Sequence, residues 1–220
     1  MKETQMTRNP VFYADSADTE EVAALLAAGV ITGVTTNPTI LARSNRGASD
    51  IPELARRWSA EGAERVFFQA WGSTAAELIE RGTEIASLGS NITVKVPATT
   101  IGFTAARALI AQDVSVLITA VYAPAQALLA AAIGADFIAP YLGRLEDSGQ
   151  DGVAVIADFA ALVADSDTEV LAASLRTPDA IAALARVGVW QFTAAPGVIW
   201  ACMQNDVSDA SAAAFESDMG

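Results

Sequence analysis

Short runs of β-branched and aromatic residues alternate with alanine-rich stretches along nearly the whole chain. Runs of five or six mostly apolar residues are typical of strands that are buried on both faces of a parallel sheet, and the stretches between them have the composition of helices. The predicted strands cover residues 11–15, 31–35, 66–70, 92–96, 115–119, 136–140, 169–174 and 189–193.

The stretches between the strands carry helix end signals. Asp18 can cap a helix that Gly29 closes, and Thr177-Pro178 is a cap followed by a proline, with Gly188 beyond the end. Eight strands that alternate with eight helices predict an α/β fold, a single (β/α)8 TIM barrel. An open doubly wound sheet is the alternative, but no glycine-rich dinucleotide motif follows the first strand.

The chain shows no linker or shift in composition that would divide it. We therefore expect one barrel domain over residues 1–220, with a helical tail at about 203–220. Residues 114–135 carry no charge and approach the length of a membrane span, but polar residues and a proline interrupt them and aspartates flank them. A buried strand followed by a buried helix explains this segment better.

Charge and composition exclude several classes of function. Asp and Glu number 26 against 13 Lys and Arg, and the net charge of −13 argues against nucleic acid or an anionic membrane as a partner. The chain has no histidine and one cysteine, Cys202, so triads and metal sites built on histidine are excluded, and we expect no metal. Because residues 1–10 lack the apolar stretch of a signal peptide, we expect a cytoplasmic protein.

A lysine stands inside the predicted strand 92–96, Ile-Thr-Val-Lys-Val. The only other lysine in the chain is Lys2. A buried ammonium is disfavoured unless a carboxylate pairs with it or its pKa falls. Lys95 is therefore a structural lysine in a buried ion pair, an amine nucleophile that forms a Schiff base, or a lysine that holds pyridoxal phosphate. The strand alone does not distinguish these three interpretations.

Polar side chains end several of the predicted strands, and in a barrel these ends face one shared cavity. The candidate site residues are Asp15, Asn37, Gln69, Thr119 and Tyr141. Each also has an ordinary explanation, since Asp15 can cap a turn and Asn37 can form an Asx turn. Taken singly, none of them defines a reaction.

Two arginines and a serine follow the sixth and seventh predicted strands. Arg144 follows the sixth strand, and Ser174 and Arg176 end and follow the seventh. Barrel enzymes often bind phosphate at the loops after the late strands, and arginine makes forked contacts with phosphate oxygens. These residues predict an anion site, although each arginine alone also fits a solvated surface position.

The motifs as a set closely resemble the small transaldolase family, and especially its fructose-6-phosphate aldolase branch. The resemblance extends from about residue 11 to about residue 200. It is carried by ADSAD at 14–18, GVTTNPTI at 33–40, TVKVPAT at 93–99, GADFIAPYLGRLED at 134–147 and VLAASLRTP at 170–178. The family fold is a (β/α)8 barrel that needs no cofactor, with its Schiff-base lysine on the fourth strand.

The resemblance implies a role for each candidate. Lys95 would form an iminium with the C2 ketone, and Asp15 would exchange a proton with the substrate hydroxyl during C3–C4 cleavage. Asn37 and Thr119 would position the dihydroxyacetone unit and a water molecule. The phosphate-binding positions of the family correspond to Arg144, Ser174 and Arg176.

Three positions separate the two activities of the family. Transaldolases generally carry glutamate, phenylalanine and serine where this chain has Gln69, Tyr141 and Ala139, all of the aldolase type. The resemblance therefore implies reversible cleavage of fructose 6-phosphate, or a similar ketose phosphate, to dihydroxyacetone and glyceraldehyde 3-phosphate. The arginines themselves would accept a phosphate or a sulfonate. The alternative is a transaldolase that transfers the dihydroxyacetone unit between sugar phosphates.

Some segments depart from the family pattern. Ile101 stands where the aldolase has an acidic residue, and the region after Cys202 matches poorly. Family members associate through that region, which implies a homo-oligomer, a pentamer or decamer. A sugar-phosphate-binding barrel without activity is a further alternative, but it leaves Lys95 unexplained.

Overall fold

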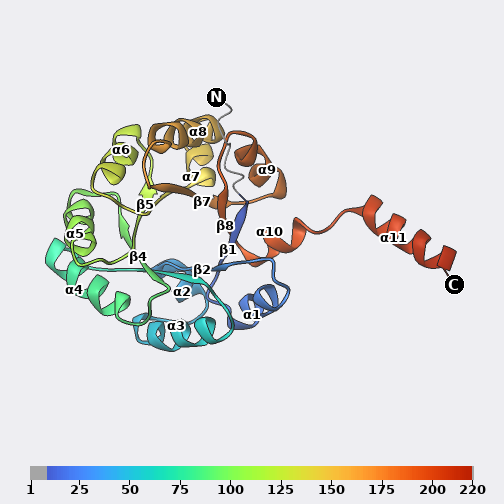
Figure 1. The fold of residues 1–220 in the computed structure, drawn as a ribbon, viewed down its shortest axis with the longest axis horizontal. Helices are drawn as coiled ribbons and strands as arrows, with labels where there is room; N and C mark the ends of the chain where they lie inside the picture. The colour runs from blue at the N-terminus through green and yellow to red at the C-terminus, as the bar shows by residue number, and fades with distance from the viewer. Residues whose placement is uncertain (1–8, 220) are drawn as a thin grey trace, which may run out of the picture.

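Eight parallel strands pair in sequence order, and the eighth pairs with the first to close a barrel. The computed structural model describes residues 9–219, so Lys2 and the two ends of the expected 1–220 domain lie outside the described residues. Looking down the barrel, Figure 1 shows the ring of strands inside a ring of helices. The strands are β1 (Val11–Asp15), β2 (Gly33–Thr35), β3 (Arg65–Gln69), β4 (Ile92–Pro97), β5 (Val116–Val121), β6 (Phe137–Pro140), β7 (Glu169–Leu175) and β8 (Gln191–Ala194).

The predicted strands agree with the observed ones. Every predicted strand overlaps one observed strand, and no end differs by more than two residues. The predicted fold class, a single (β/α)8 TIM barrel, is confirmed.

The prediction of eight helices is wrong, because the described residues contain eleven α-helices. Two helices follow each of β2, β6 and β8, and the short ones escape prediction because six residues are too few to show a helical period. The helices are α1 (Thr19–Ala27), α2 (Pro38–Arg43), α3 (Ile51–Ala60), α4 (Ala75–Ala86), α5 (Thr100–Ile110), α6 (Pro124–Ala132), α7 (Leu142–Asp147), α8 (Gly152–Val163), α9 (Pro178–Arg186), α10 (Pro196–Ala201) and α11 (Asp206–Met219).

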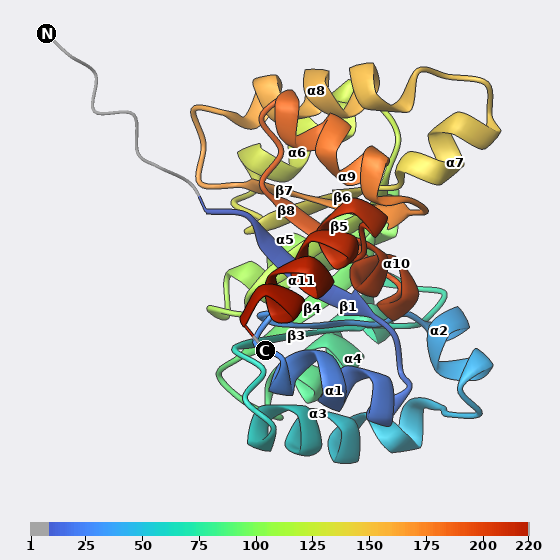
Figure 2. The same ribbon diagram turned by 90° about the vertical axis from the view of Figure 1, so that its right-hand side faces the viewer.

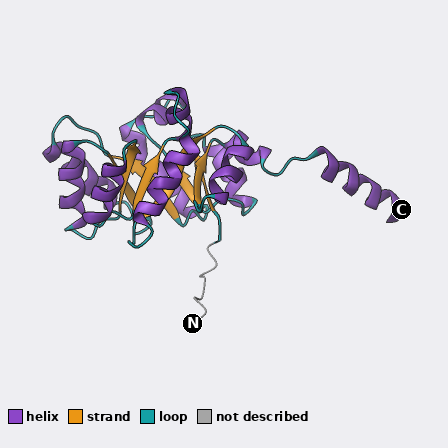
Figure 3. Cartoon of the chain, turned by 90° about the horizontal axis from the view of Figure 1, so that it is seen from above, coloured by secondary structure: helices purple, strands orange, loops and turns teal. Residues whose placement is uncertain are grey.

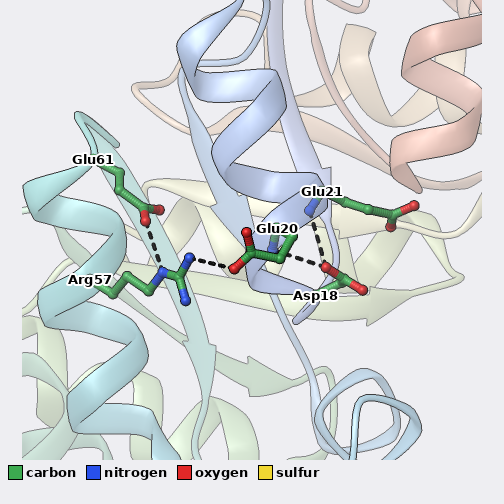
Figure 4. A network of polar contacts seen from close by, with 5 residues as sticks. All are labelled: Asp18, Glu20, Glu21, Arg57 and Glu61. Atoms are coloured by element: carbon green, nitrogen blue, oxygen red, sulfur yellow. Dashed lines mark hydrogen bonds and ion pairs between the residues drawn. The ribbon is translucent and has the colours of Figure 1, made fainter.

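Side-chain caps fix where several helices begin. Asp18 accepts hydrogen bonds from the backbone N–H groups of Glu20 and Glu21, at 3.0 and 3.1 Å, as predicted for the start of α1. Figure 4 shows this cap beside an ion-pair network in which Arg57 of α3 contacts Glu20 of α1 and Glu61. The network links two neighbouring helices of the outer ring.

The barrel interior is filled by side chains that lie two residues before the polar strand ends. Phe67 packs edge-on against Tyr13 and Phe137, with ring centroids 5.2 and 5.5 Å apart. Leu117 belongs to the same inner cluster, and both it and Phe67 are fully buried. Because side chains alternate along a strand, Gln69 and Thr119 also point inward, one layer closer to the C-terminal end. The apolar cluster in the barrel interior therefore lies directly beneath a layer of polar side chains at the C-terminal ends of the strands.

The uncharged run at 114–135 contains β5 and α6 rather than one long helix. Among residues 9–219, none of the helices has both the length and the apolar character that a membrane span requires. The helical part of the C-terminal tail is α11, which extends away from the barrel in Figures 1 and 3 and has no buried residue.

Candidate active site

A cavity of about 370 Å³ opens at the C-terminal ends of the strands. The strand ends and the segments that follow them supply polar or charged lining residues, which include Asp15, Asn37, Thr39, Arg43, Gln69, Lys95, Tyr141 and Arg144. Ser174 at the end of β7 also lines it, whereas Thr119 and Arg176 do not. Seven of the nine predicted site residues therefore meet at one cavity.

Lys95 on β4 lines this cavity, with 4% of its surface exposed. Val94 and Val96 on either side of it are fully buried and hold the strand in the barrel wall. The ammonium Nζ donates one hydrogen bond, to the carbonyl oxygen of Thr36 at 2.8 Å. Burial lowers the pKa of Lys95, and the charge of Asp15 opposes this with a smaller effect. The site therefore favours the neutral amine.

Asp15 ends β1 and is the titratable neighbour of Lys95. The hydroxyl of Thr35 donates to Asp15 Oδ1 at 2.6 Å and also lies 2.6 Å from the hydroxyl of Thr193. Burial raises the pKa of Asp15, although Lys95 and the Thr35 hydrogen bond favour the carboxylate. An amine whose pKa is lowered and a carboxyl group whose pKa is raised thus share one pocket.

Tyr141 follows β6 and presents its hydroxyl to the same cavity. Its hydroxyl oxygen lies 2.7 Å from that of Thr119, which is 2% exposed and joins the site through this hydrogen bond. Burial raises the pKa of Tyr141, so the phenol stays protonated and can donate. Next to Thr119, Ala120 adopts a left-handed φ of 59° where the β5–β6 register shifts. Such strained backbone is common at functional sites.

Asn37 and Gln69 line the cavity with amide groups. Asn37 Oδ1 caps α2 by accepting from the N–H of Ile40 at 3.0 Å, so its structural role is a helix cap rather than the Asx turn suggested by the sequence. Within the described part of the chain, no side-chain hydrogen bond occupies the amide nitrogen of Asn37 or either polar atom of Gln69. These groups remain able to bind a ligand or a water molecule.

The predicted anion-binding residues divide into two groups. Arg144 and Ser174 line the cavity, and Ser174 adopts a left-handed φ of 58° at a register shift in β7. Arg176 lies outside the cavity lining and forms a forked ion pair with Asp147, with N–O distances of 2.8 and 2.6 Å. The structure therefore brings two of the three predicted residues to the cavity.

Two residues at the site were not identified from the sequence. Arg43 ends α2 and lines the cavity, and the helical spacing from Ile40, another lining residue, is the signal that could have identified it. Thr35 sits within a strand, and its hydrogen bond to Asp15 depends on the pairing of β1 with β2. No sequence signal indicates that contact.

The cavity is poorly suited to a metal ion. Among residues 9–219, no cluster of three histidine, cysteine, aspartate or glutamate side chains could hold one. Asp15 is the single carboxylate that the described residues contribute to the cavity lining, whereas divalent cations need several oxygen ligands.

The closed barrel and the polar cavity at the C-terminal ends of its strands define a (β/α)8-barrel enzyme. The model of the Transaldolase/Fructose-6-phosphate aldolase family matches residues 12–219. The chain therefore belongs to this family, so the resemblance is confirmed at the level of the family, whereas the aldolase branch stays a prediction.

Relatives match over almost the whole chain. A protein of Cereibacter sphaeroides named "Probable transaldolase" is 40% identical over 209 residues, which cover 94% of each chain. Another of the same name from Hyphomonas neptunium is 36% identical over 211 residues, covering 94% of this chain and 95% of the relative.

Two solved structures share the fold at low sequence identity. Thiamine phosphate pyrophosphorylase from Pyrococcus furiosus gives a TM-score of 0.62 at 16% identity, covering 86% of this chain and 87% of that one. A 4-hydroxy-tetrahydrodipicolinate synthase from Methylacidiphilum fumariolicum gives 0.64 at 13% identity, covering 88% and 70% respectively. These likenesses concern the fold alone.

Proposed function

We propose that this protein is a Schiff-base enzyme that cleaves the C3–C4 bond of a ketose phosphate, with Lys95 as the nucleophile. The observation that carries the proposal is the buried position of Lys95, which lowers its pKa within a cavity that can admit a carbonyl compound. A neutral amine attacks the C2 carbonyl, and loss of water then gives the iminium.

Asp15 is the proposed base for the cleavage step. Burial raises the pKa of Asp15 toward neutral pH. A general acid or base works best when its pKa lies near the pH of the reaction. Asp15 takes the proton of the C4 hydroxyl as the C3–C4 bond breaks, and the electron pair of that bond passes to C3 of the enamine. The iminium nitrogen on Lys95 withdraws these electrons, which is why the lysine must be covalently bound first.

Tyr141 is the proposed donor of the proton that the enamine carbon then receives. Its phenol is protonated and 2.7 Å from Thr119, and together with the amide of Gln69 they can hold the water that hydrolyses the final iminium. The amide nitrogen of Asn37 is proposed to bind the donor hydroxyl.

Arg144 and Ser174 are proposed to bind the phosphate of the substrate. Arg176 is proposed to join them once its pair with Asp147 opens. Both partners of that pair are 54% exposed, and exposed ion pairs contribute only about 0–1 kcal/mol, so a phosphate can compete for the guanidinium.

Whether the donor is released or transferred depends on the fate of the enamine. Gln69 cannot exchange a proton, whereas Tyr141 can, and Ala139 is the third position of the aldolase type. These three residues favour protonation and net cleavage, so we propose a fructose-6-phosphate aldolase. Transaldolase activity is the second candidate, because the relatives described above bear that name.

Borohydride trapping tests the shared chemistry. Incubation with dihydroxyacetone and borohydride should leave a reduced adduct on the peptide that contains Lys95, and Lys95→Met should leave none. A folded protein without an adduct would reduce the proposal to a sugar-phosphate-binding barrel or to a site for another carbonyl compound. Turnover of fructose 6-phosphate distinguishes an aldolase from a transaldolase. We expect this substrate to be cleaved without an acceptor. Turnover only with added erythrose 4-phosphate would establish transaldolase instead.

A further inference from the structure

Arg43 places a second unpaired cation in the cavity. It is the last residue of α2, it is exposed, and it lines the cavity together with Arg144 of α7. Within the described part of the chain neither arginine forms an ion pair, although Arg176 does. Free guanidinium groups at a cavity are suited to bind anions.

The two arginines belong to opposite walls of the barrel. Arg43 follows β2 and Arg144 follows β6, and these strands are four apart in a closed ring of eight. Figure 2 shows α2 and α7 at the same end of the barrel and at opposite edges of it. Lys95 lies on β4, which is two strands from β2 and two from β6 around the ring, and it lines the same cavity as both arginines.

The positive charge of the two arginines contrasts with the net negative charge of the molecule. The chain carries a net charge of −13, yet the cavity is lined by two unpaired guanidinium groups and by one carboxyl group, which burial makes less acidic. An anion that enters is therefore attracted locally against the field of the whole protein. A single phosphate at Arg144 would leave Arg43 without a partner.

We propose that Arg43 forms a second anion site, so that the cavity takes ketoses with an anionic group at both ends, such as a ketose bisphosphate. Asn37, the proposed partner of the donor hydroxyl, begins the same short helix that Arg43 ends. The donor end of the substrate therefore faces Arg43, and the aldehyde end faces Arg144. This inference rests on the proposed function for the direction of the substrate, but not for the anion site itself.

With fructose 1,6-bisphosphate the chemistry remains the same. The C3–C4 bond breaks, its electron pair passes to C3, and the C4 hydroxyl loses its proton to a base. C3 then takes up a proton and water hydrolyses the iminium. The products are glyceraldehyde 3-phosphate and dihydroxyacetone phosphate, with no change in overall oxidation state.

Binding of carbonyl-free analogues tests the second site directly. Glucitol 6-phosphate and glucitol 1,6-bisphosphate cannot form a Schiff base, so titration calorimetry measures the anion contacts alone. We expect the bisphosphate to bind the full-length protein about tenfold more tightly, as one added charge-assisted contact predicts. Arg43→Gln should abolish this preference, and Arg144→Gln should weaken both ligands.

Arg56→Gln is the matched control, because Arg56 is an exposed arginine of α3 outside the cavity lining and its loss changes the net charge equally. It should leave the preference within about twofold of the parent, since remote charges are screened. Equal affinity for the two analogues, or a preference that survives Arg43→Gln, would overturn the inference. Absence of a Lys95 adduct would instead overturn the proposed function and leave this result standing.

Discussion

At the scale of the residue, the burial of Lys95 and of the nearby Asp15 determines how the site responds to pH. Both groups lie in the barrel wall, and burial pushes each toward its neutral form. A lysine whose pKa is lowered on folding binds its proton more weakly in the folded than in the unfolded chain. Its contribution to stability is therefore absent below the folded pKa, and it grows as pH rises from the folded to the unfolded value.

We expect the rate of adduct formation with dihydroxyacetone to rise with pH and to level off well below the ordinary lysine pKa of 10.5, since only the neutral amine attacks. The measurement is intact mass after borohydride quenching at a series of pH values. The free energy of unfolding should rise with pH between the lowered pKa of Lys95 in the folded chain and its ordinary pKa in the unfolded chain. The Lys95→Met variant should not show this rise. A rate that levels off only near 10.5 would show that burial does not lower the pKa.

Most of the cavity residues were predictable because they end strands with a clear pattern. Gln69 and Lys95 stand in apolar runs, where a polar residue is conspicuous. Arg43 was missed, because its helical spacing from Ile40 becomes informative only once α2 is known to lie beside the cavity. The ion pair between Arg176 and Asp147 was also not predicted, because the two residues are 29 positions apart in the sequence and meet only in the folded barrel.

At the scale of the element, the barrel depends on close approach between strands and the helices that follow them. Gly102 lies in the first turn of α5, and a Cβ atom added there would stand 1.9 Å from the carbonyl oxygen of Pro97 at the end of β4. The backbone of Pro97 cannot move aside in the way that a flexible side chain can. The glycine therefore keeps α5 close to the strand that carries Lys95.

Gly102→Ala should lower the unfolding free energy by about 2 kcal/mol or more, through the steric mechanism typical of overpacked sites. It should also reduce the yield of Lys95 adduct, because β4 must shift. Gly197→Ala is the control, since Gly197 lies in α10 with nothing within 4 Å of an added Cβ. Helix propensity predicts that this change raises stability by up to about 1 kcal/mol. Denaturant titration of both variants measures the difference, and equal stabilities would contradict the close-approach argument.

At the scale of the whole molecule, α11 is a helix without a surface to pack on. None of its described residues is buried, and Val207, Phe215 and Met219 are 74%, 69% and 87% exposed. These apolar residues are spaced by four or eight positions and share one face of the helix. An isolated helix of 14 residues is marginal in water, and acidic residues in its last turn oppose its dipole. The helix therefore needs a partner to be stable.

A second copy of the chain is the partner that we expect, in keeping with the homo-oligomer that the resemblance implies. Removal of residues 206–220 should lower the particle mass measured by multi-angle light scattering to that of a smaller assembly or a monomer. Phe215→Asp should have a similar effect, because it places a charge in the apolar face that would be buried between copies.

Ala213→Asp adds the same charge about 200° away around the helix, on its polar side, and should leave the mass unchanged. If all three proteins have the mass of the parent, then α11 does not mediate association. If Phe215→Asp and Ala213→Asp lower the mass equally, then net charge rather than the apolar face controls it. Dissociation that follows only the apolar face would establish α11 as the contact between copies. The lone helix of the single chain would then be one half of an interface.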